Sequence, residues 1–365
     1  MRTPEPVSGD PGTDAQRAAP ADTGAAARWT AGLPKAEVHL HLEGCVPPSW
    51  VGGGSGTGAA PAFTTLGEFL GHLDRSCAQV TRGEQLQHIA QAITARARES
   101  GAEHVDVIFN PSHWPAWKRD LGGFVRALDA GLAAGEEEHG VTSALCLSLL
   151  RTQPPEDSVG LVDWLLEKRP PRVVALSVDG NEAAAGPTGE RFRPLFARAR
   201  AAGLRTCAHA GESSGPDGVR DAVELLAAER IDHGIRAVED AALVAELAAR
   251  GTPLDVCPTS NVRLGVVPSM AAHPVERLRA AGVRVSVNTD DPLLFGTTVA
   301  GEYGACAAAF GWDRRILGEI ARTSIESCFA PPDRRRELLG ALDRYLADPG
   351  GTALEDGPPA QEGSR

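Results

Sequence analysis

Two histidines stand two residues apart where an apolar run near the N-terminus ends. The run covers residues 36–40, and the motif HLHLEG places His39 and His41 at its end. Side chains alternate along a β-strand, so both imidazoles would project from one face. That geometry can set two nitrogen ligands on one metal ion. Taken alone, the pair leaves a structural role open.

Four more polar residues follow later apolar runs in the same way. His209 closes the run in CAHAGE, His233 closes the run in RIDHG, and Asp290 and Asp291 follow VSVN. In a parallel barrel these strand ends converge on one mouth, where active sites form. The joint placement therefore predicts one shared site. The other histidines lie in helices, in loops or at a strand start, and we interpret them as ordinary residues: His72, His88, His104, His113, His139 and His273.

Imidazole and carboxylate ligands without a thiolate suit Zn²⁺ and related first-row ions. An open position on such an ion holds water and lowers its pKa to about 7, which makes hydroxide available at neutral pH. Glu212 follows His209 closely and can transfer a proton, while His233 and Asp291 can orient the water and bind the electrophile. These residues predict hydrolysis at a polarised carbon.

Eight apolar or β-branched runs can position these residues. They are 36–40, 103–109, 143–149, 172–178, 204–208, 229–232, 253–257 and 283–287. Helical patterns lie between most of them, for example at 84–100, 123–140, 218–229 and 239–251. This alternation predicts an α/β fold, a (β/α)₈ TIM-type barrel with a mononuclear metal site at its C-terminal mouth. A doubly wound open sheet is the alternative.

A length of 365 residues is ordinary for a (β/α)₈ barrel with insertions. We expect a disordered leader over residues 1–30, a catalytic domain over 31–348 and a disordered tail over 349–365. The stretch GGGSGTGAAPA at 52–62 is interpreted as a surface loop or as a flap beside the active site. It is no P-loop, since no Gly-Lys-Ser/Thr follows.

The composition narrows the choice of partners. The net charge is −12, and no basic stripe occurs, which argues against nucleic acid or an anionic membrane surface. No apolar run approaches the roughly 18–20 residues of a membrane span. The seven cysteines are odd in number, widely spaced and without a CxxC pair. Without a signal-peptide pattern, they indicate reduced thiols and a cytoplasmic protein. The oligomeric state is not readable from these features.

Five motifs, in this order, resemble the adenosine deaminase family of metal-dependent amidohydrolases. They are PKAEVHLHLEG (34–44), HAGE (209–212), RIDHGIRAVED (230–240), CPTSNVRLG (257–265) and VSVNTDDPLLFGT (285–297). The resemblance runs from about residue 33 to 345. It implies a (β/α)₈ barrel with one Zn²⁺ per chain, held by His39, His41, His209 and Asp290.

The resemblance also implies roles for the remaining site residues. Glu212 would protonate N1 of a purine, and His233 would hold and help to activate the water. Asp291 would hydrogen-bond N7, and the backbone of Gly180 in VDGNE would donate to N3. The implied substrate contacts are His41, Glu43, Gly180 and Asp291. Because Glu212 must be neutral when it donates, we expect it to be partly buried with a raised pKa.

Departures from the family pattern bear on the substrate. Adenosine-specific members generally carry Asp where this chain has Glu43, whereas Glu resembles the adenine and aminodeoxyfutalosine branches. The motif NTDDPLLFGT looks more like the nucleoside branches. The leading hypothesis is deamination of the 6-amino group of adenosine or a 5′-modified adenosine such as aminodeoxyfutalosine. Adenine deamination is the alternative, and a catalytically dead barrel or a hydrolase of non-purine substrates are further ones.

Overall fold

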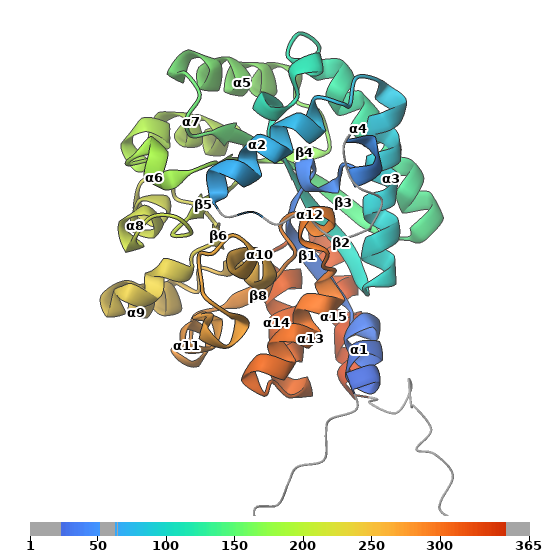
Figure 1. Ribbon diagram of the computed structural model, residues 1–365, viewed down its shortest axis with the longest axis vertical. Helices are drawn as coiled ribbons and strands as arrows, with labels where there is room; N and C mark the ends of the chain where they lie inside the picture. Colours follow the sequence, from blue (N-terminus) through green and yellow to red (C-terminus); the bar gives the residue numbers. More distant parts are fainter. Residues whose placement is uncertain (1–22, 52–62, 64, 348–365) are drawn as a thin grey trace, which may run out of the picture.

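The computed structural model describes residues 23–51, 63 and 65–347, and it contains a barrel of eight parallel strands. Neighbouring strands in the barrel are also neighbours in sequence, from β1 to β8. Helices surround the strands, and both ends of the described chain lie at the same end of the molecule (Figure 1). The strands are β1 (Lys35–His41), β2 (Ala102–Phe109), β3 (Thr142–Leu150), β4 (Val173–Asp179), β5 (Arg205–Ala210), β6 (Arg230–His233), β7 (Leu254–Val256) and β8 (Val285–Val287).

The helices fill most of the connections between strands. The α-helices are α1 (Thr23–Gly32), α2 (Leu66–Cys77), α3 (Gly83–Glu99), α4 (Leu121–His139), α5 (Pro155–Lys168), α6 (Glu182–Ala185), α7 (Gly189–Ala201), α8 (Pro216–Glu224), α9 (Ala241–Arg250), α10 (Pro258–Arg263), α11 (Val275–Ala280), α12 (Pro292–Phe295), α13 (Val299–Phe310), α14 (Arg314–Ser327) and α15 (Pro332–Ala347). Short 3₁₀ helices are η1 (Glu43–Cys45), η2 (Pro48–Trp50), η3 (Pro111–His113), η4 (Pro115–Trp117), η5 (Ile235–Glu239) and η6 (Met270–Ala272).

The predicted (β/α)₈ fold is confirmed, and the open-sheet alternative is wrong because the first strand meets the segment after the last. Leu40 forms a parallel bridge with Asp290. The backbone N–H of His41 donates to the Asp290 carbonyl at 2.8 Å, and the Asp290 N–H donates to the His39 carbonyl at 3.1 Å. All eight expected strands are present, with ends shifted by one or two residues.

Local sequence signals explain where the helices begin and end. The Asp120 carboxylate accepts from the Gly123 N–H at the start of α4, and the Asp240 carboxylate caps α9. Gly140 and Gly251 end these two helices in the left-handed conformation that glycine adopts without strain. The helix expected over 218–229 is shorter, because α8 stops at Glu224 so that the chain can reach β6.

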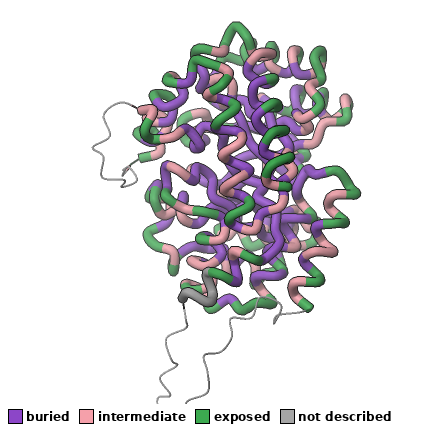
Figure 2. Tube along the Cα trace, turned by 90° about the vertical axis from the view of Figure 1, so that its right-hand side faces the viewer, coloured by how far each residue is buried: buried purple, intermediate pink, exposed green. Residues whose placement is uncertain are grey.

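The strands are buried on both faces, as parallel strands covered by helices must be. Figure 2 shows buried backbone through the centre of the molecule and exposed residues on the outer turns. All seven cysteines are buried and unpaired. Within the described residues, no helix is long and apolar enough to cross a membrane.

The described structure includes a helix that crosses the expected domain boundary at residue 31. Helix α1 starts at Thr23, and Trp29 and Thr30 are buried. The hydroxyl of Tyr345 in α15 donates to the Trp29 carbonyl, so an aromatic anchor holds this helix against the barrel. The rest of the expected leader, the stretch 52–62 and the tail lie outside the described residues. The assignment of the domains stays a prediction.

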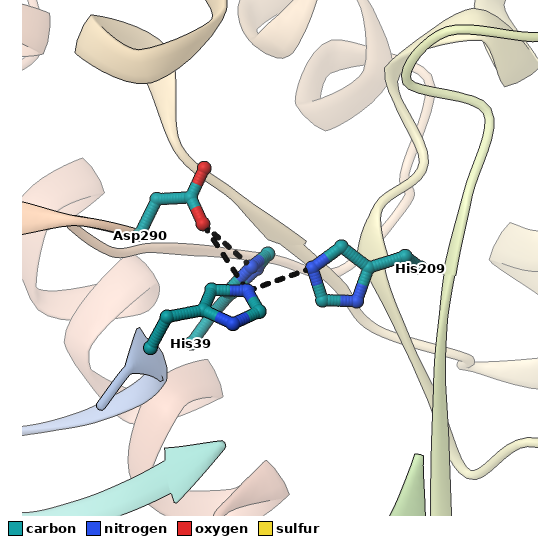
Figure 3. A group of neighbouring side chains, drawn as sticks. His39, His209 and Asp290 are labelled. Atoms are coloured by element: carbon teal, nitrogen blue, oxygen red, sulfur yellow. Dashed lines mark hydrogen bonds and ion pairs between the residues drawn. The ribbon is translucent and has the colours of Figure 1, made fainter. Parts of the chain in front are cut away.

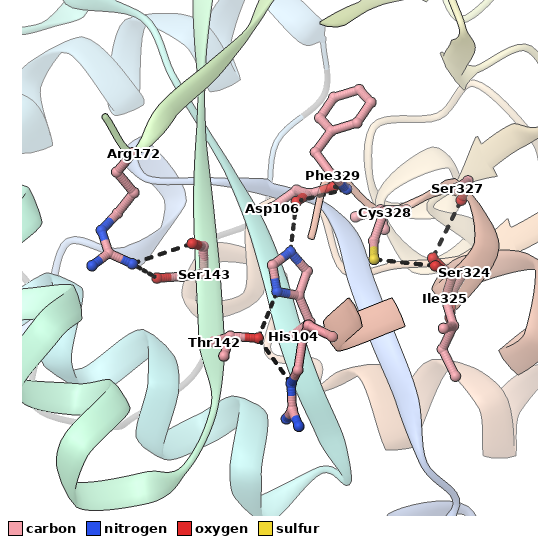
Figure 4. A network of polar contacts seen from close by, with 12 residues as sticks. His104, Asp106, Thr142, Ser143, Arg172, Ser324, Ile325, Ser327, Cys328 and Phe329 are labelled. Carbon is pink, nitrogen blue, oxygen red and sulfur yellow. Dashed lines mark hydrogen bonds and ion pairs between the residues drawn. The ribbon is translucent and has the colours of Figure 1, made fainter. Parts of the chain in front are cut away.

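A buried ionic network crosses the interior of the barrel. The guanidinium of Arg230 on β6 pairs with Asp106 on β2 at 2.5 Å and with Asp255 on β7 at 3.0 Å. Asp106 also accepts from His104 and from the Phe329 backbone (Figure 4). Burial alone would raise the pKa of Asp106, but Arg230 and His104 hold it below its usual range. His104 is thus a structural residue, as expected.

We expect Asp106→Asn to lower the free energy of unfolding by about 3–5 kcal/mol, because it leaves part of a buried cation without its partner. Urea denaturation monitored by circular dichroism measures this loss. The matched control is Asp333→Asn, which removes an exposed ion pair with Arg336 and should leave stability unchanged within error. Equal losses in the two variants would contradict this account.

Candidate active site

The two histidines of β1 meet His209 and Asp290 at the C-terminal mouth of the barrel. His209 lies at the end of β5, and Asp290 follows β8. The Nε2 atoms of His41 and His209 are 2.9 Å apart, and Asp290 Oδ1 lies 3.3 Å from Nε2 of both His39 and His41. One atom from each of the four residues falls within 4.8 Å of the others. Figure 3 shows the side chains of His39, His209 and Asp290 pointing toward one another.

Two of the imidazoles have a close oxygen at Nδ1, the ring nitrogen that faces away from the cluster. His39 Nδ1 forms a 3.0 Å hydrogen bond with the Asp255 carbonyl, whereas His209 Nδ1 lies 3.2 Å from Asp232 Oδ2 without the alignment of a hydrogen bond. A proton on Nδ1 leaves Nε2 as the basic atom that faces the cluster. The Nε2 of His39 is buried and has no hydrogen-bond partner among the described residues. Such an atom fits a metal ion, and so does a nearby ionised carboxylate.

The electrostatics of the cluster keep one carboxylate ionised. Burial would raise the pKa of Asp290, but the imidazoles of His39 and His233 lower it well below its usual range. Burial, together with neighbouring imidazoles, lowers the pKa of His41 to about 4. His41 is thus neutral, as metal binding requires, whereas Asp290 outweighs burial and raises the pKa of His39 to about 9, so a bound ion must displace that proton.

His233 and Asp290 both adopt a positive φ of 65°. The left-handed region is unfavourable for residues other than glycine, and such strain concentrates at functional sites. At Asp290 the backbone is held there by its two hydrogen bonds to β1. The strain thus occurs where the site residues leave their strands.

Glu212 lies on the loop after β5, with Oε1 3.6 Å from His233 Nε2. The carboxylate of Glu182 in α6 fixes this loop, since it accepts from the backbone N–H groups of Gly211 and Glu212, both at 2.9 Å, and of Ser213 at 3.1 Å. Burial raises the pKa of Glu212 to about 8, with help from the charges of Asp290 and Glu182. Glu212 is therefore protonated at neutral pH, as expected, and can donate a proton.

A small pocket opens above the cluster, with a cavity volume of about 50 Å³. Its walls include the predicted residues His41, Glu43, Gly180, His209, Glu212, His233, Asp290 and Asp291. His39 lies beneath it, fully buried. Apolar side chains of α2 cover one side, namely Leu66, Phe69, Leu70 and Leu73. The structure therefore brings all the predicted site residues together.

Glu43 forms the part of the wall next to His41. Its Oε1 accepts from the indole N–H of Trp114 at 2.6 Å and from the Asn110 backbone at 2.8 Å. The Asn110 side chain in turn donates to Asp179 at 2.6 Å. Glu43 Oε2 is buried and has no hydrogen-bond partner among the described residues, and burial raises the pKa of Glu43 to about 7. These hydrogen bonds thus hold the Glu43 carboxylate in place and leave Oε2 as an acceptor without a partner among the described residues.

Asp291 is buried against Gly44, where a Cβ would come within 2.4 Å of the Asp291 Cα. Only glycine permits this close approach. Burial and the neighbouring charge of Asp290 raise the pKa of Asp291 well above its usual range. Asp291 Oδ1 has no hydrogen-bond partner in the described part of the chain. A neutral carboxyl group at this position can donate a hydrogen bond.

Sequence reasoning missed several residues that shape the site. Asp232, Asp179 and Glu182 were read only as parts of motifs, and His113 was read as ordinary although it lines the pocket. The alternation of side chains along β6 could have identified Asp232. It lies two residues from the inward-facing Arg230 and therefore on the same side of the strand. Nothing local in the sequence identifies Glu182 as the residue that holds the 211–214 loop.

Known proteins resemble this chain over most of its length. It is 35% identical over 336 residues to an adenine deaminase of Sphingopyxis alaskensis, which covers 87% of this chain and 96% of the relative. It is also 35% identical to an adenine deaminase of Streptomyces coelicolor, with 87% and 94% covered. The crystal structure of an adenine deaminase from Arthrobacter aurescens has a TM-score of 0.80 and 30% identity, covering 86% of this chain and 99% of that one.

An amidohydrolase from Burkholderia ambifaria, solved with bound Zn, has a TM-score of 0.78 and 27% identity, with 88% of this chain and 94% of that one covered. The sequence profile of the adenosine deaminase family matches residues 57–345. That match spans β2 to β8 and includes His209, Glu212, His233, Asp290 and Asp291. The chain belongs to the adenosine deaminase family of hydrolytic deaminases.

Proposed function

We propose that this deaminase uses one Zn²⁺ to remove the 6-amino group of a purine, and that free adenine is its preferred substrate. The reaction consumes water and yields hypoxanthine and ammonia. The relatives and the Arthrobacter aurescens structure named above, all adenine deaminases, support this choice. The observation that carries it is the fixed position of the Glu43 carboxylate in the pocket wall, where Trp114 and the Asn110 backbone hold it.

The proposed zinc ligands are His39, His41, His209 and Asp290. Their atoms converge, His39 Nε2 lacks another partner, and Asp290 is ionised. Three imidazoles and one carboxylate without thiolate suit Zn²⁺. When bound, the ion acts as a Lewis acid and lowers the pKa of water to about 7. The zinc-containing structure from Burkholderia ambifaria is consistent with this assignment.

The other residues act on the purine and on the protons. Glu212, neutral at pH 7, would donate a proton to N1 and so make C6 more electrophilic. Asp291 would donate a hydrogen bond to N7, and the Gly180 N–H would hold N3. His233 Nε2, 3.6 Å from Glu212 and 3.8 Å from Asp290, would orient the attacking water and accept its proton.

The pocket favours the base over the nucleoside. The cavity beside the cluster is small, with a volume of about 50 Å³. Trp114 and Asn110 hold the Glu43 carboxylate in place, so the wall does not yield easily to a ribose. The unpaired Oε2 suits the N9–H of free adenine, a donor that adenosine lacks. A site built to accept from an N–H group rejects an analogue without it.

Three hypotheses from the sequence are thereby disfavoured. Adenosine and its 5′-modified derivatives need space beyond Glu43, where Trp114 is fully buried. A dead barrel would lack a ligand or the acid, yet the four proposed ligands converge and Glu212 lines the pocket above them. A non-purine substrate would leave Asp291 and Gly180 without their proposed partners.

We expect zinc-loaded protein to release ammonia from adenine with kcat/KM at least about 100-fold above adenosine, methylthioadenosine and aminodeoxyfutalosine. Parallel metal analysis should find about one zinc per chain. Higher turnover of any nucleoside would contradict the proposed preference, and no turnover of any of the four by zinc-loaded protein would contradict the function itself.

We expect Glu212→Gln to lower kcat for adenine by about 10²–10⁴-fold, since the amide cannot donate a proton as a carboxyl group does. Zinc content should stay the same, because Glu212 is not a proposed ligand. The matched control is Glu224→Gln on the exposed face of α8, which should keep full activity. Unaltered turnover in Glu212→Gln would remove its role as the acid.

A further inference from the structure

A buried carboxylate lies directly behind one of the clustered imidazoles. Asp232 on β6 pairs in register with His209 on β5, and its Oδ2 lies 3.2 Å from His209 Nδ1. Asp232 is completely buried. It is therefore within hydrogen-bond distance of the ring nitrogen that faces away from the cluster.

The surroundings of Asp232 leave His209 as its main partner. Ser177 Oγ is 3.4 Å from Oδ2, a long contact, and Oδ1 has no hydrogen-bond partner among the described residues. Arg230 lies on the same strand but forms its ion pairs with Asp106 and Asp255. A buried carboxylate without a dedicated cation is costly unless another group stabilises it. The His209 imidazole, with Nδ1 3.2 Å from Oδ2, is the group placed to supply that stabilisation.

The other two imidazoles are held differently. His39 Nδ1 faces a neutral backbone carbonyl, that of Asp255. His41 Nδ1 is 3.9 Å from Glu43 Oε2, beyond hydrogen-bond distance. Among these three histidines, only His209 has a carboxylate oxygen as close as 3.2 Å to its Nδ1, although the pair is not aligned as a hydrogen bond.

We propose that Asp232 is a positioning residue that fixes His209 with its proton on Nδ1 and so directs a basic Nε2 at the zinc. This inference rests on the proposed zinc site. The carboxylate orients the ring and increases the basicity of Nε2, as partners behind ligating histidines do. Asp232 itself touches neither the metal nor the substrate.

The direct test measures zinc affinity rather than activity. Competition with a chromophoric chelator gives the Kd of zinc for wild type and for Asp232→Asn, which keeps the shape of the side chain but not its charge. We expect the variant to bind zinc about 10–100-fold more weakly. An affinity equal to that of wild type overturns the proposal.

The matched control is Glu302→Gln in α13. Glu302 is as deeply buried as Asp232, but its carboxylate accepts from the Thr259 backbone and the Thr297 hydroxyl and contacts none of the clustered histidines. Its zinc affinity should stay within about threefold of wild type. A loss in Glu302→Gln as large as that in Asp232→Asn would show a general effect of buried charge and overturn the specific role.

A second measurement needs no variant. In zinc-loaded wild-type protein labelled with ¹⁵N-histidine, nuclear magnetic resonance should show the His209 proton on Nδ1 and none on Nε2. A proton on Nε2, or none on Nδ1, overturns the proposal. If wild type binds no zinc at all, the zinc-dependent function fails first. If wild type binds zinc but the His209 proton is not on Nδ1, only the role of Asp232 fails. The same holds if wild type binds zinc and Asp232→Asn binds it equally well.

Discussion

Two backbone hydrogen bonds close the barrel at the site. His41 donates to the carbonyl of Asp290, and Asp290 donates to the carbonyl of His39. They join the first strand to the segment after the last strand, so the histidine pair and the carboxylate take their relative positions from the closed barrel. The positive φ of Asp290 is maintained by the same bonds. Without closure, the cluster would lose one of its four members.

Beneath the pocket, buried polar side chains inside the barrel connect the site residues to further strands. Arg230 connects Asp106 and Asp255, the carbonyl of Asp255 holds His39, and Asp232 lies 3.2 Å behind His209. Buried charges are expensive, and each is compensated by a partner from another strand. The ionic network and the imidazole cluster are thus parts of one structure, and its rigidity can preorganise the site before any ligand binds.

Much of this could be predicted from the sequence. The eight strands follow from apolar runs in the sequence. Because active sites lie at the C-terminal ends of barrel strands, the sequence also predicts that His39, His209 and Asp290 lie close together. The wall around Glu43 could not be predicted, because it depends on Trp114 and Asn110 from the loop after a different strand. Helix α1 was missed because its ordering depends on Trp29 and Tyr345, which lie at opposite ends of the chain.

We expect one zinc ion to join the four residues that barrel closure brings together. An anomalous difference map from crystals of zinc-loaded protein, recorded at the zinc absorption edge, locates the ion. The map should show a single strong peak about 2.0–2.2 Å from Nε2 of His39, His41 and His209 and from a carboxylate oxygen of Asp290. A peak bound by other residues, or no peak in fully zinc-loaded protein, would contradict it.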